Sequence, residues 1–236
     1  MPPESPPEIS DLLNKPQVVA TVHTPSDLEA LETPSLAGQA DLLEFRLDSL
    51  ALPPSELAPR IAAAALPAIL TARHPSEGGD GNLGPDERRA LLEAHLDGAA
   101  ALDVELRSVP EFGAFLSEIA AAGKLLILST HDFDATPSPS ELHAAIERAA
   151  AAGADIVKIA THLAKVSDLA SLATLLEEEH PVPLSLMGMG PLGRVSRLLL
   201  AQSGSILNYG YLTQPNAPGQ WPASRLKELI RELEQE

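Results

Sequence analysis

A lysine in the middle of a short apolar run is the residue of this sequence with the clearest chemical potential. The run, residues 154–162, is rich in β-branched side chains and follows a glycine, as is typical of a parallel strand buried on both faces. Its central residue, Lys158, must either extend its ammonium group to solvent at the strand end or lose its charge through desolvation. A neutral amine is a nucleophile, so the position favours covalent catalysis, with a solvated strand-end lysine as the alternative.

A histidine at the end of the preceding predicted strand offers proton transfer. Neutral imidazole, with an unperturbed pKa of ~6.5, can accept and return a proton at neutral pH. His131 is therefore predicted to be a general acid and base that converges with Lys158 on one small substrate. The remaining histidines lie on predicted loops or helices without metal-ligand partners, so we expect no metal site and interpret them as surface or structural residues: His23, His74, His95, His143, His162 and His180.

Charged side chains alternate along one predicted strand and therefore share one face of it. These are Glu44, Arg46 and Asp48. Charges that point into a protein interior must pair with one another or bind something. They indicate either substrate contacts or an internal layer of salt bridges, and the second interpretation suits Asp48 best. Other predicted strands end with the charged residues Arg73, Asp103 and Glu105, and the seventh ends with two methionines, Met187 and Met189.

These residues need a fold that gathers the ends of parallel strands at one place. Eight apolar runs each precede a helical pattern, and the sequence has no nucleotide-binding glycine fingerprint. We therefore predict an α/β protein consisting of a single (β/α)8 TIM barrel, with its site at the carboxyl ends of the strands and the loop 77–84 covering the mouth. The predicted strands are 17–23, 42–48, 68–73, 102–106, 124–131, 154–162, 183–189 and 206–211. The predicted helices are 24–38, 55–65, 85–98, 108–123, 138–153, 167–179, 191–204 and 222–235.

Composition limits the partners and the compartment. Residues 1–16 are rich in proline and are predicted to form a flexible arm before the catalytic barrel of residues 17–236. The net charge of −17 argues against nucleic acid or a membrane surface as partner. An anionic substrate would therefore need a local pocket of arginines. The chain has no cysteine and its start is unlike a signal peptide, so we expect a cytoplasmic protein.

The candidate residues fall within motifs whose order is itself informative. The motifs are Glu44-Phe45-Arg46-Leu47-Asp48, Thr71-Ala72-Arg73 with Glu77-Gly78-Gly79, Ser129-Thr130-His131-Asp132-Phe133, Val157-Lys158-Ile159-Ala160, Met187-Gly188-Met189 with Ser196-Arg197, and Ala217-Pro218-Gly219-Gln220. In this order, over residues 17–235, the sequence resembles the type I 3-dehydroquinate dehydratases. The resemblance implies a homodimeric, cofactor-free barrel enzyme of the shikimate pathway, which converts 3-dehydroquinate to 3-dehydroshikimate by syn elimination of water.

The resemblance also implies a role for each matching residue. Lys158 corresponds to the Schiff-base lysine, His131 to the general acid/base, and Glu77 to the glutamate associated with that histidine. The substrate carboxylate is expected to pair with Arg197, with help from Gln220 on the closing loop. Ring hydroxyls are expected to be held by Glu44, Arg46 and Arg73. The chain departs from the family near the Pro-Gly-Gln turn, where Asn216 stands in place of a frequent serine and can still donate to a carboxylate.

Two other functions are compatible with parts of this pattern. A class I aldolase would share the lysine within a strand, but would make or break a carbon–carbon bond. The residues around Glu44, together with His131 and the Pro-Gly-Gln turn, argue against that activity. A catalytically silent barrel that serves as a binding protein would not need so complete a set of polar residues at the mouth.

Overall fold

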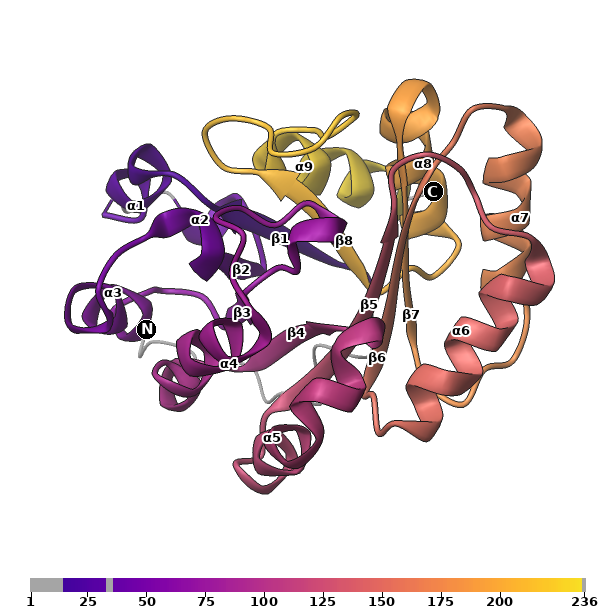
Figure 1. Ribbon diagram of the computed structural model, residues 1–236. Helices are drawn as coiled ribbons and strands as arrows, with labels where there is room; N and C mark the ends of the chain where they lie inside the picture. Colours follow the sequence, from indigo (N-terminus) through magenta and orange to yellow (C-terminus); the bar gives the residue numbers. More distant parts are fainter. Residues whose placement is uncertain (1–14, 33–35, 235–236) are drawn as a thin grey trace.

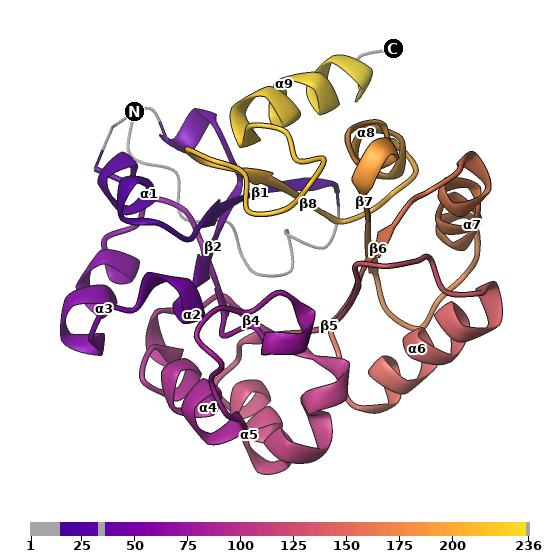
Figure 2. The ribbon, with the colours of Figure 1, turned by 45° about the horizontal axis from the view of Figure 1, so that its top comes forward.

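Short apolar segments form the eight parallel strands at the centre of the structure, a computed structural model that describes residues 15–32 and 36–234. The strands are joined by ladders in the order β7-β6-β5-β4-β3-β2-β1-β8 and curve into a barrel that helices surround (Figures 1 and 2). Their bounds are β1 Gln17–Val22, β2 Leu42–Arg46, β3 Ala68–Thr71, β4 Ala101–Glu105, β5 Leu125–Asp132, β6 Ile156–His162, β7 Leu184–Met189 and β8 Leu207–Tyr211.

The barrel closes between β7 and β8, the two ends of the ladder order, largely through serine side chains. The Ser185 hydroxyl on β7 donates to the carbonyl of Leu207 on β8 at 2.7 Å. The Ser205 hydroxyl, just before β8, accepts the N–H of Leu186 at 2.9 Å. Side-chain hydroxyls thus take the place of part of the backbone ladder along this seam.

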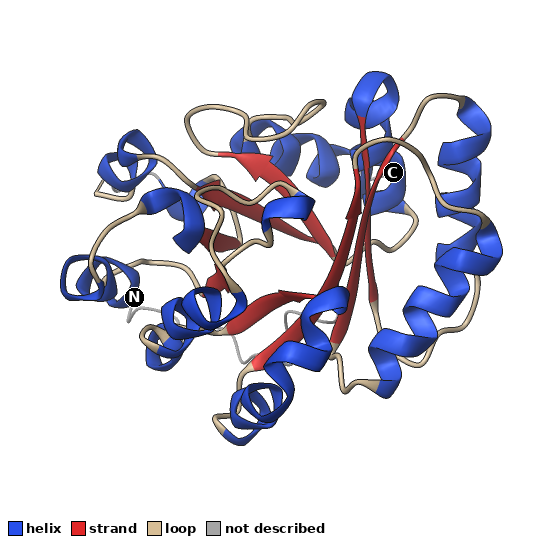
Figure 3. Ribbon diagram, viewed as in Figure 1, coloured by secondary structure: helices blue, strands red, loops and turns tan. Residues whose placement is uncertain are grey.

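Helices form the outer layer of the molecule (Figure 3). They are α1 Pro25–Ala30, α2 Leu47–Leu50, α3 Pro54–Ala62, α4 Pro85–Glu93, α5 Val109–Ala121, α6 Pro139–Ala151, α7 Val166–Glu177, α8 Gly193–Gln202 and α9 Ala223–Glu234. Short 3-10 turns lie between elements: η2 Leu36–Gly38, η3 Pro75–Glu77, η4 Leu96–Gly98, η5 Leu106–Ser108 and η6 Gly190–Leu192. Among the described residues, no helix is long and apolar enough to cross a bilayer.

Alternation along each strand separates two apolar layers and orients the polar residues. On β6, Ile156 and Ala160 belong to the cluster inside the barrel, whereas Val157 and Ile159 pack into the layer beneath the helices. Successive side chains of a strand point to opposite faces, so Lys158 points into the barrel. The fold class predicted from the sequence is confirmed.

Several predicted boundaries are wrong for identifiable reasons. The second strand ends at Arg46, because Leu47–Leu50 forms α2, so Asp48 follows the strand and is not part of it. The third strand ends at Thr71, which places Arg73 in the loop after it. The predicted helix 85–98 is two pieces, since α4 ends at Glu93 and η4 follows.

The first predicted helix, 24–38, is also too long. It ends at Ala30, and η2 is a separate turn. The sequence has a proline at position 34, which lacks the N–H that a continuing helix needs. Of the predicted N-terminal arm, residues 1–14 lie outside the described residues.

Candidate active site

The carboxyl ends of the strands surround a cavity of about 120 Å³ at the mouth of the barrel. All residues predicted from the sequence to form the site line this cavity, namely Glu44, Arg46, Arg73, Glu77, His131, Lys158, Arg197, Asn216 and Gln220. Their convergence follows from the parallel arrangement, since every strand delivers its last residues to the same end of the barrel.

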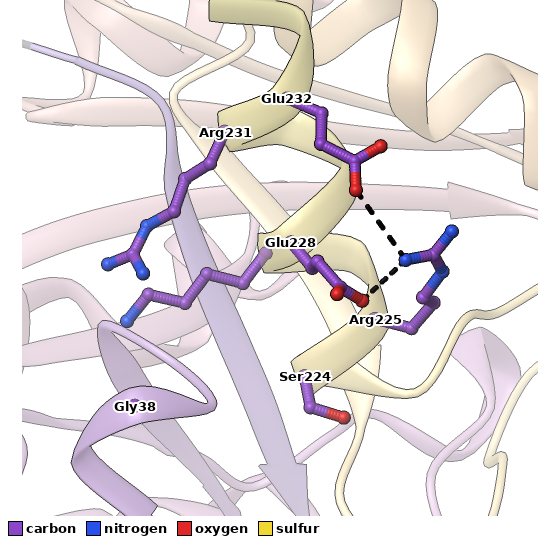
Figure 4. A pocket seen from close by; sticks show the side chains of 7 residues that line it. Gly38, Ser224, Arg225, Glu228, Arg231 and Glu232 are labelled. Atoms are coloured by element: carbon purple, nitrogen blue, oxygen red, sulfur yellow. Dashed lines mark hydrogen bonds and ion pairs between the residues drawn. The ribbon is translucent and has the colours of Figure 1, made fainter.

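A larger hollow of about 640 Å³ lies on the outer surface, where α9 faces η2 (Figure 4). Within it, Arg225 pairs with Glu228 and Glu232 on the same helix. None of the residues that the sequence singles out for chemistry lines this hollow. The candidate site is therefore the cavity at the barrel mouth.

Lys158 is buried in that cavity, with 3% of its surface exposed. Its Nζ donates to Asp103 Oδ2 at 2.8 Å and lies 3.6 Å from Glu44 Oε1. The ring of Tyr209 lies on another side, with its centroid 3.8 Å from Nζ. The alternative of a solvated strand-end lysine is therefore wrong, and carboxylate contacts offset the burial of the amine.

His131 and Glu77 form a hydrogen-bonded pair beside Lys158. Nδ1 of the imidazole lies 2.9 Å from Glu77 Oε2, and the same oxygen accepts the backbone N–H of His131 at 2.9 Å. Burial, together with the positive charges of Arg73 and Lys158, holds the pKa of His131 well below its ordinary value. Burial and the nearby charge of Glu105 raise the pKa of Glu77 to about 7.

Arg73 holds a buried network together beneath the cavity. Its guanidinium donates to both oxygens of Asp103, at 2.9 and 2.8 Å, and to Glu105 at 2.8 Å. Burial alone would raise the pKa of Asp103, but the charges of Arg73 and Lys158 outweigh it and hold that pKa well below its ordinary value. Glu44, 3.8 Å from Arg73, is oriented by hydrogen bonds from the hydroxyls of Thr21 and Thr71. The carboxylates that contact Lys158 thus have fixed positions.

Arg46 and Asp48 confirm the interpretation of an internal salt bridge. Two nitrogens of Arg46 donate to the two oxygens of Asp48 at 3.0 and 2.8 Å, which is the bidentate geometry of a strong pair. Arg46 also donates to the carbonyl of Gly78, and Asp48 accepts the N–H of Asp80. The pair therefore anchors the glycine-rich loop that carries Glu77.

Arg197 differs from the other cations of the site. It is 2% exposed, and among the described residues no carboxylate lies within ion-pair distance of it. Its guanidinium donates instead to the carbonyls of Tyr209, at 2.7 Å, and Gly219, at 3.3 Å. Burial lowers its pKa to about 10, so the group still carries its charge at neutral pH. An anion at the cavity would meet an unneutralised buried cation.

The loop after β8 lies over Arg197 and is held by its own side chains. Gln220 is buried, and its Oε1 accepts the N–H groups of Asn216, at 3.0 Å, and Ala217, at 3.3 Å. Gly219 has a φ of 80° and passes so close to Gly193 that a Cβ would lie 2.9 Å from its Cα. Only glycine suits that position. Oδ1 of Asn216 is buried without a hydrogen-bond partner among the described residues, which leaves an acceptor at the cavity wall.

The sequence motifs do not single out Tyr209 and Arg88, although both residues contribute to the site. Tyr209 on β8 faces the cavity beside Lys158, and the inward register of that strand was the signal that could have identified it. Arg88 on α4 is 1% exposed and donates to Glu105 at 2.8 Å. No local pattern distinguishes Arg88 from a surface arginine, because its burial depends on a strand that lies elsewhere in the sequence.

Known proteins resemble this chain in sequence and in fold. The sequence family described as type I 3-dehydroquinase matches residues 18–236. A 3-dehydroquinate dehydratase of Methanothrix thermoacetophila is 34% identical over 220 residues, which cover 93% of this chain and 92% of the relative. One from Lactiplantibacillus plantarum is 31% identical over 96% of this chain and 95% of its own. The crystal structure of 3-dehydroquinate dehydratase from Geobacillus kaustophilus superimposes with a TM-score of 0.85 at 28% identity, covering 94% of this chain and 92% of that chain.

Proposed function

The chain belongs to the type I 3-dehydroquinase family, the 3-dehydroquinate dehydratases (EC 4.2.1.10) of the shikimate pathway, and on this premise we propose how its residues carry out the reaction. The proposed reaction is the syn elimination of water from 3-dehydroquinate through a Schiff base on Lys158. The observation that carries the proposal is the presence of a buried amine, a neutral imidazole and an unpaired arginine in one cavity.

Lys158 supplies the electron sink. Nζ first gives one proton to a neighbouring carboxylate, and the neutral amine then attacks the ketone carbon. That proton leaves with the carbinol hydroxyl as water and gives an iminium, whose positive charge accepts the electrons of the neighbouring C–H bond. The contacts of Nζ with Asp103 and Glu44 support this role, because they hold the nitrogen at the end of a rigid strand. The reacting atom is thus positioned before the substrate arrives.

His131 moves the proton. Its low pKa keeps the imidazole neutral at neutral pH, and Nδ1 faces Glu77, so Nε2 is the nitrogen left to take the proton from carbon. The resulting enamine expels the ring hydroxyl, and the imidazolium returns its proton to that leaving group to make water. Hydrolysis of the product iminium then frees Lys158 and the 3-dehydroshikimate ketone.

Arg197 binds the substrate carboxylate in this proposal, assisted by Gln220 and Asn216. A planar guanidinium presents two donors to a carboxylate, and no protein carboxylate competes for it among the described residues. Glu44, Arg46 and Arg73 are the candidates for holding the ring hydroxyls, since all line the same cavity.

Borohydride trapping tests the proposal directly. Reduction of the enzyme in the presence of 3-dehydroquinate, followed by peptide mass mapping, should give a stable adduct on Lys158. Lys158→Ala should give no adduct and no detectable turnover while the barrel still folds. Lys165→Ala, an exposed lysine just beyond the same strand, is the matched control and should be trapped like the wild type.

The two alternatives have their own signatures in the same experiment. An aldolase would release carbon–carbon cleavage products instead of a conjugated enone that absorbs in the ultraviolet. A silent binding protein would bind 3-dehydroquinate without adduct or turnover. Either result would contradict the proposal. The homodimer and the cytoplasmic location stay predictions of the sequence.

A further inference from the structure

The aromatic ring of Tyr209 is the only uncharged group among the described residues that the structure places in close electrostatic contact with the nitrogen of Lys158. Nζ lies 3.8 Å from the ring centroid, within the range at which a cation is attracted to the negative face of an aromatic ring. Tyr209 is buried on β8 and lines the same cavity as Lys158. The ring therefore touches the atom on which the proposed chemistry takes place.

Tyr209 works through its ring face and has no role as an acid or base. Burial and the charges of Glu44 and Asp103 raise the pKa of its phenol well above the ordinary value, so the group stays protonated and neutral. Its hydroxyl is buried and makes no hydrogen bond to the described residues. The hydroxyl is thus dispensable for contacts with the protein, whereas the ring is not.

Schiff-base formation affects the contacts of Nζ with the carboxylates and with the ring of Tyr209 in different ways. An ammonium and a ketone combine to give an iminium and one water; the positive charge stays on nitrogen, while its N–H bonds fall from three to one. Nζ donates one hydrogen bond, to Asp103, and its contact with Glu44 at 3.6 Å is an ion pair; the iminium keeps a single N–H, whose direction is fixed by the planar C=N group. Attraction to an aromatic face depends on the charge and needs no N–H. The ring contact is therefore retained when the number of N–H donors falls, as is the ion pair with Glu44, whereas the hydrogen bond to Asp103 depends on the one N–H that is left.

We propose that Tyr209 is a catalytic residue whose ring face stabilises the positive charge of the iminium on Lys158. This inference rests on the proposed function, since it assigns a group to the same Schiff base. It predicts that the electron density of the ring face sets the amount of iminium, and that the hydroxyl does not.

A series of rings of nearly constant shape tests the proposal. Tyr209→Phe is the reference of the series, since it keeps the ring, and it should not lower Tm, because the hydroxyl that it removes makes no hydrogen bond to the described residues. Mono-, di- and trifluorinated phenylalanine at position 209 withdraw density from the ring face stepwise. Both kcat and the fraction of enzyme trapped by borohydride at a fixed time should fall with each fluorine, by about tenfold over the series. KM should change much less.

Controls separate this inference from the function on which it rests. The same fluorinated residues at position 211, a half-buried tyrosine further along β8, should leave kcat and trapping unchanged. Tyr209→Leu should resemble the trifluorinated variant, and the fluorinated series decides the question if the leucine variant does not fold. A flat series, with a Lys158 adduct in the wild type, would overturn the role of Tyr209 alone. Absence of that adduct in the wild type would instead overturn the proposed function.

Discussion

Arg197 is a buried cation that has no carboxylate partner among the described residues. The other buried cations of the network each contact a carboxylate: Arg46 with Asp48, Arg73 with Asp103, Arg88 with Glu105, and Lys158 with Asp103. An unpaired buried charge lowers the free energy of unfolding, because no partner compensates for the loss of its hydration. In the proposed function the substrate carboxylate supplies the missing partner, so we expect substrate binding to offset this desolvation. Stability of the free enzyme and affinity for substrate are therefore in opposition at this residue.

Replacing Arg197 should separate these two effects. Arg197→Met should raise KM by ~30-fold or more, which corresponds to the ~2–5 kcal/mol lost when one partner of a buried charged pair is removed. The same change should raise Tm of the free enzyme. Steady-state kinetics and thermal unfolding measure the two outcomes. Arg194→Met, one turn earlier on α8 and exposed, is the control, and an unchanged KM in Arg197→Met would contradict the carboxylate assignment.

The pair of His131 and Glu77 should control the pH dependence. Above pH about 7 the Glu77 carboxylate accepts the Nδ1 proton, and Nε2 is free to act as the base. Below that pH, protonated Glu77 donates to Nδ1, so Nε2 carries the ring proton and cannot accept another. We expect kcat to fall about tenfold per pH unit below about 7.

The glutamine variant provides the test of this assignment. Glu77→Gln cannot titrate, so the loss of activity near pH 7 should disappear from its pH profile, even though the plateau is lower. The charged groups that face Glu77 are Glu105, Arg73 and Arg107, and all remain in the variant. A pH profile with the same midpoint in wild type and Glu77→Gln would show that another group titrates.

At the scale of the elements, strand alternation explains how much of the site could be predicted from the sequence. Lys158, Glu44 and Arg46 belong to strands whose apolar neighbours reveal which face points inward, and parallel strands deliver their ends to one place. The alternation predicts that Asp48 continues the strand, but the chain forms the helix α2 directly after Arg46. The alternation of side chains does not indicate the residue at which a strand ends.

The buried contacts of Arg88 cannot be predicted from the alternation of a strand. Its side chain crosses from α4 to β4, where Glu105 accepts from Arg88 at 2.8 Å and from Arg73 at 2.8 Å. The backbone N–H of His74, at the start of the loop with Glu77, donates to the same carboxylate at 3.0 Å. The contact between Arg88 and Glu105 depends on how close α4 lies to β4, which the sequence alone does not give. It links an outer helix to the charges around the reacting amine.

Loss of Arg88 should therefore be costly. Arg88→Met leaves Glu105 with less compensation in the interior and should lower the free energy of unfolding by ~3–5 kcal/mol. Denaturant unfolding measures this difference. Arg89→Met, the next residue and 44% exposed, breaks only a surface pair with Glu93 and should change stability by less than ~1 kcal/mol. Equal losses in both variants would contradict a special role for the buried contact.

At the scale of the whole molecule, an acidic protein must attract an anionic substrate. The net charge is −17, whereas Arg197, the cation proposed to bind the substrate carboxylate, is buried at the cavity. Salt screens charges separated by more than a Debye length of about 10 Å at 0.1 M, but screens buried contacts much less. The long-range repulsion should weaken with added salt while the local attraction remains.

KM for 3-dehydroquinate should therefore fall as ionic strength rises from about 10 to about 200 mM, with kcat nearly constant. Initial-rate kinetics in sodium chloride measure the effect. Tetramethylammonium chloride is the control for a specific effect of sodium. A KM that rises with salt would mean that local positive potential, and not the net charge, governs the approach of the substrate.

We expect adjacent strands of the barrel to separate most easily at the seam between β7 and β8. Where Ser185 and Ser205 replace part of the ladder, fewer backbone hydrogen bonds must break for neighbouring strands to separate. We therefore expect amide protons along this seam to exchange with solvent through a partial opening, and those of β4, β5 and β6 to exchange more slowly, through global unfolding. Arg197 follows β7 and Tyr209 lies on β8. The residues proposed to bind the substrate carboxylate and to face the iminium are thus attached to the two strands that we expect to separate first.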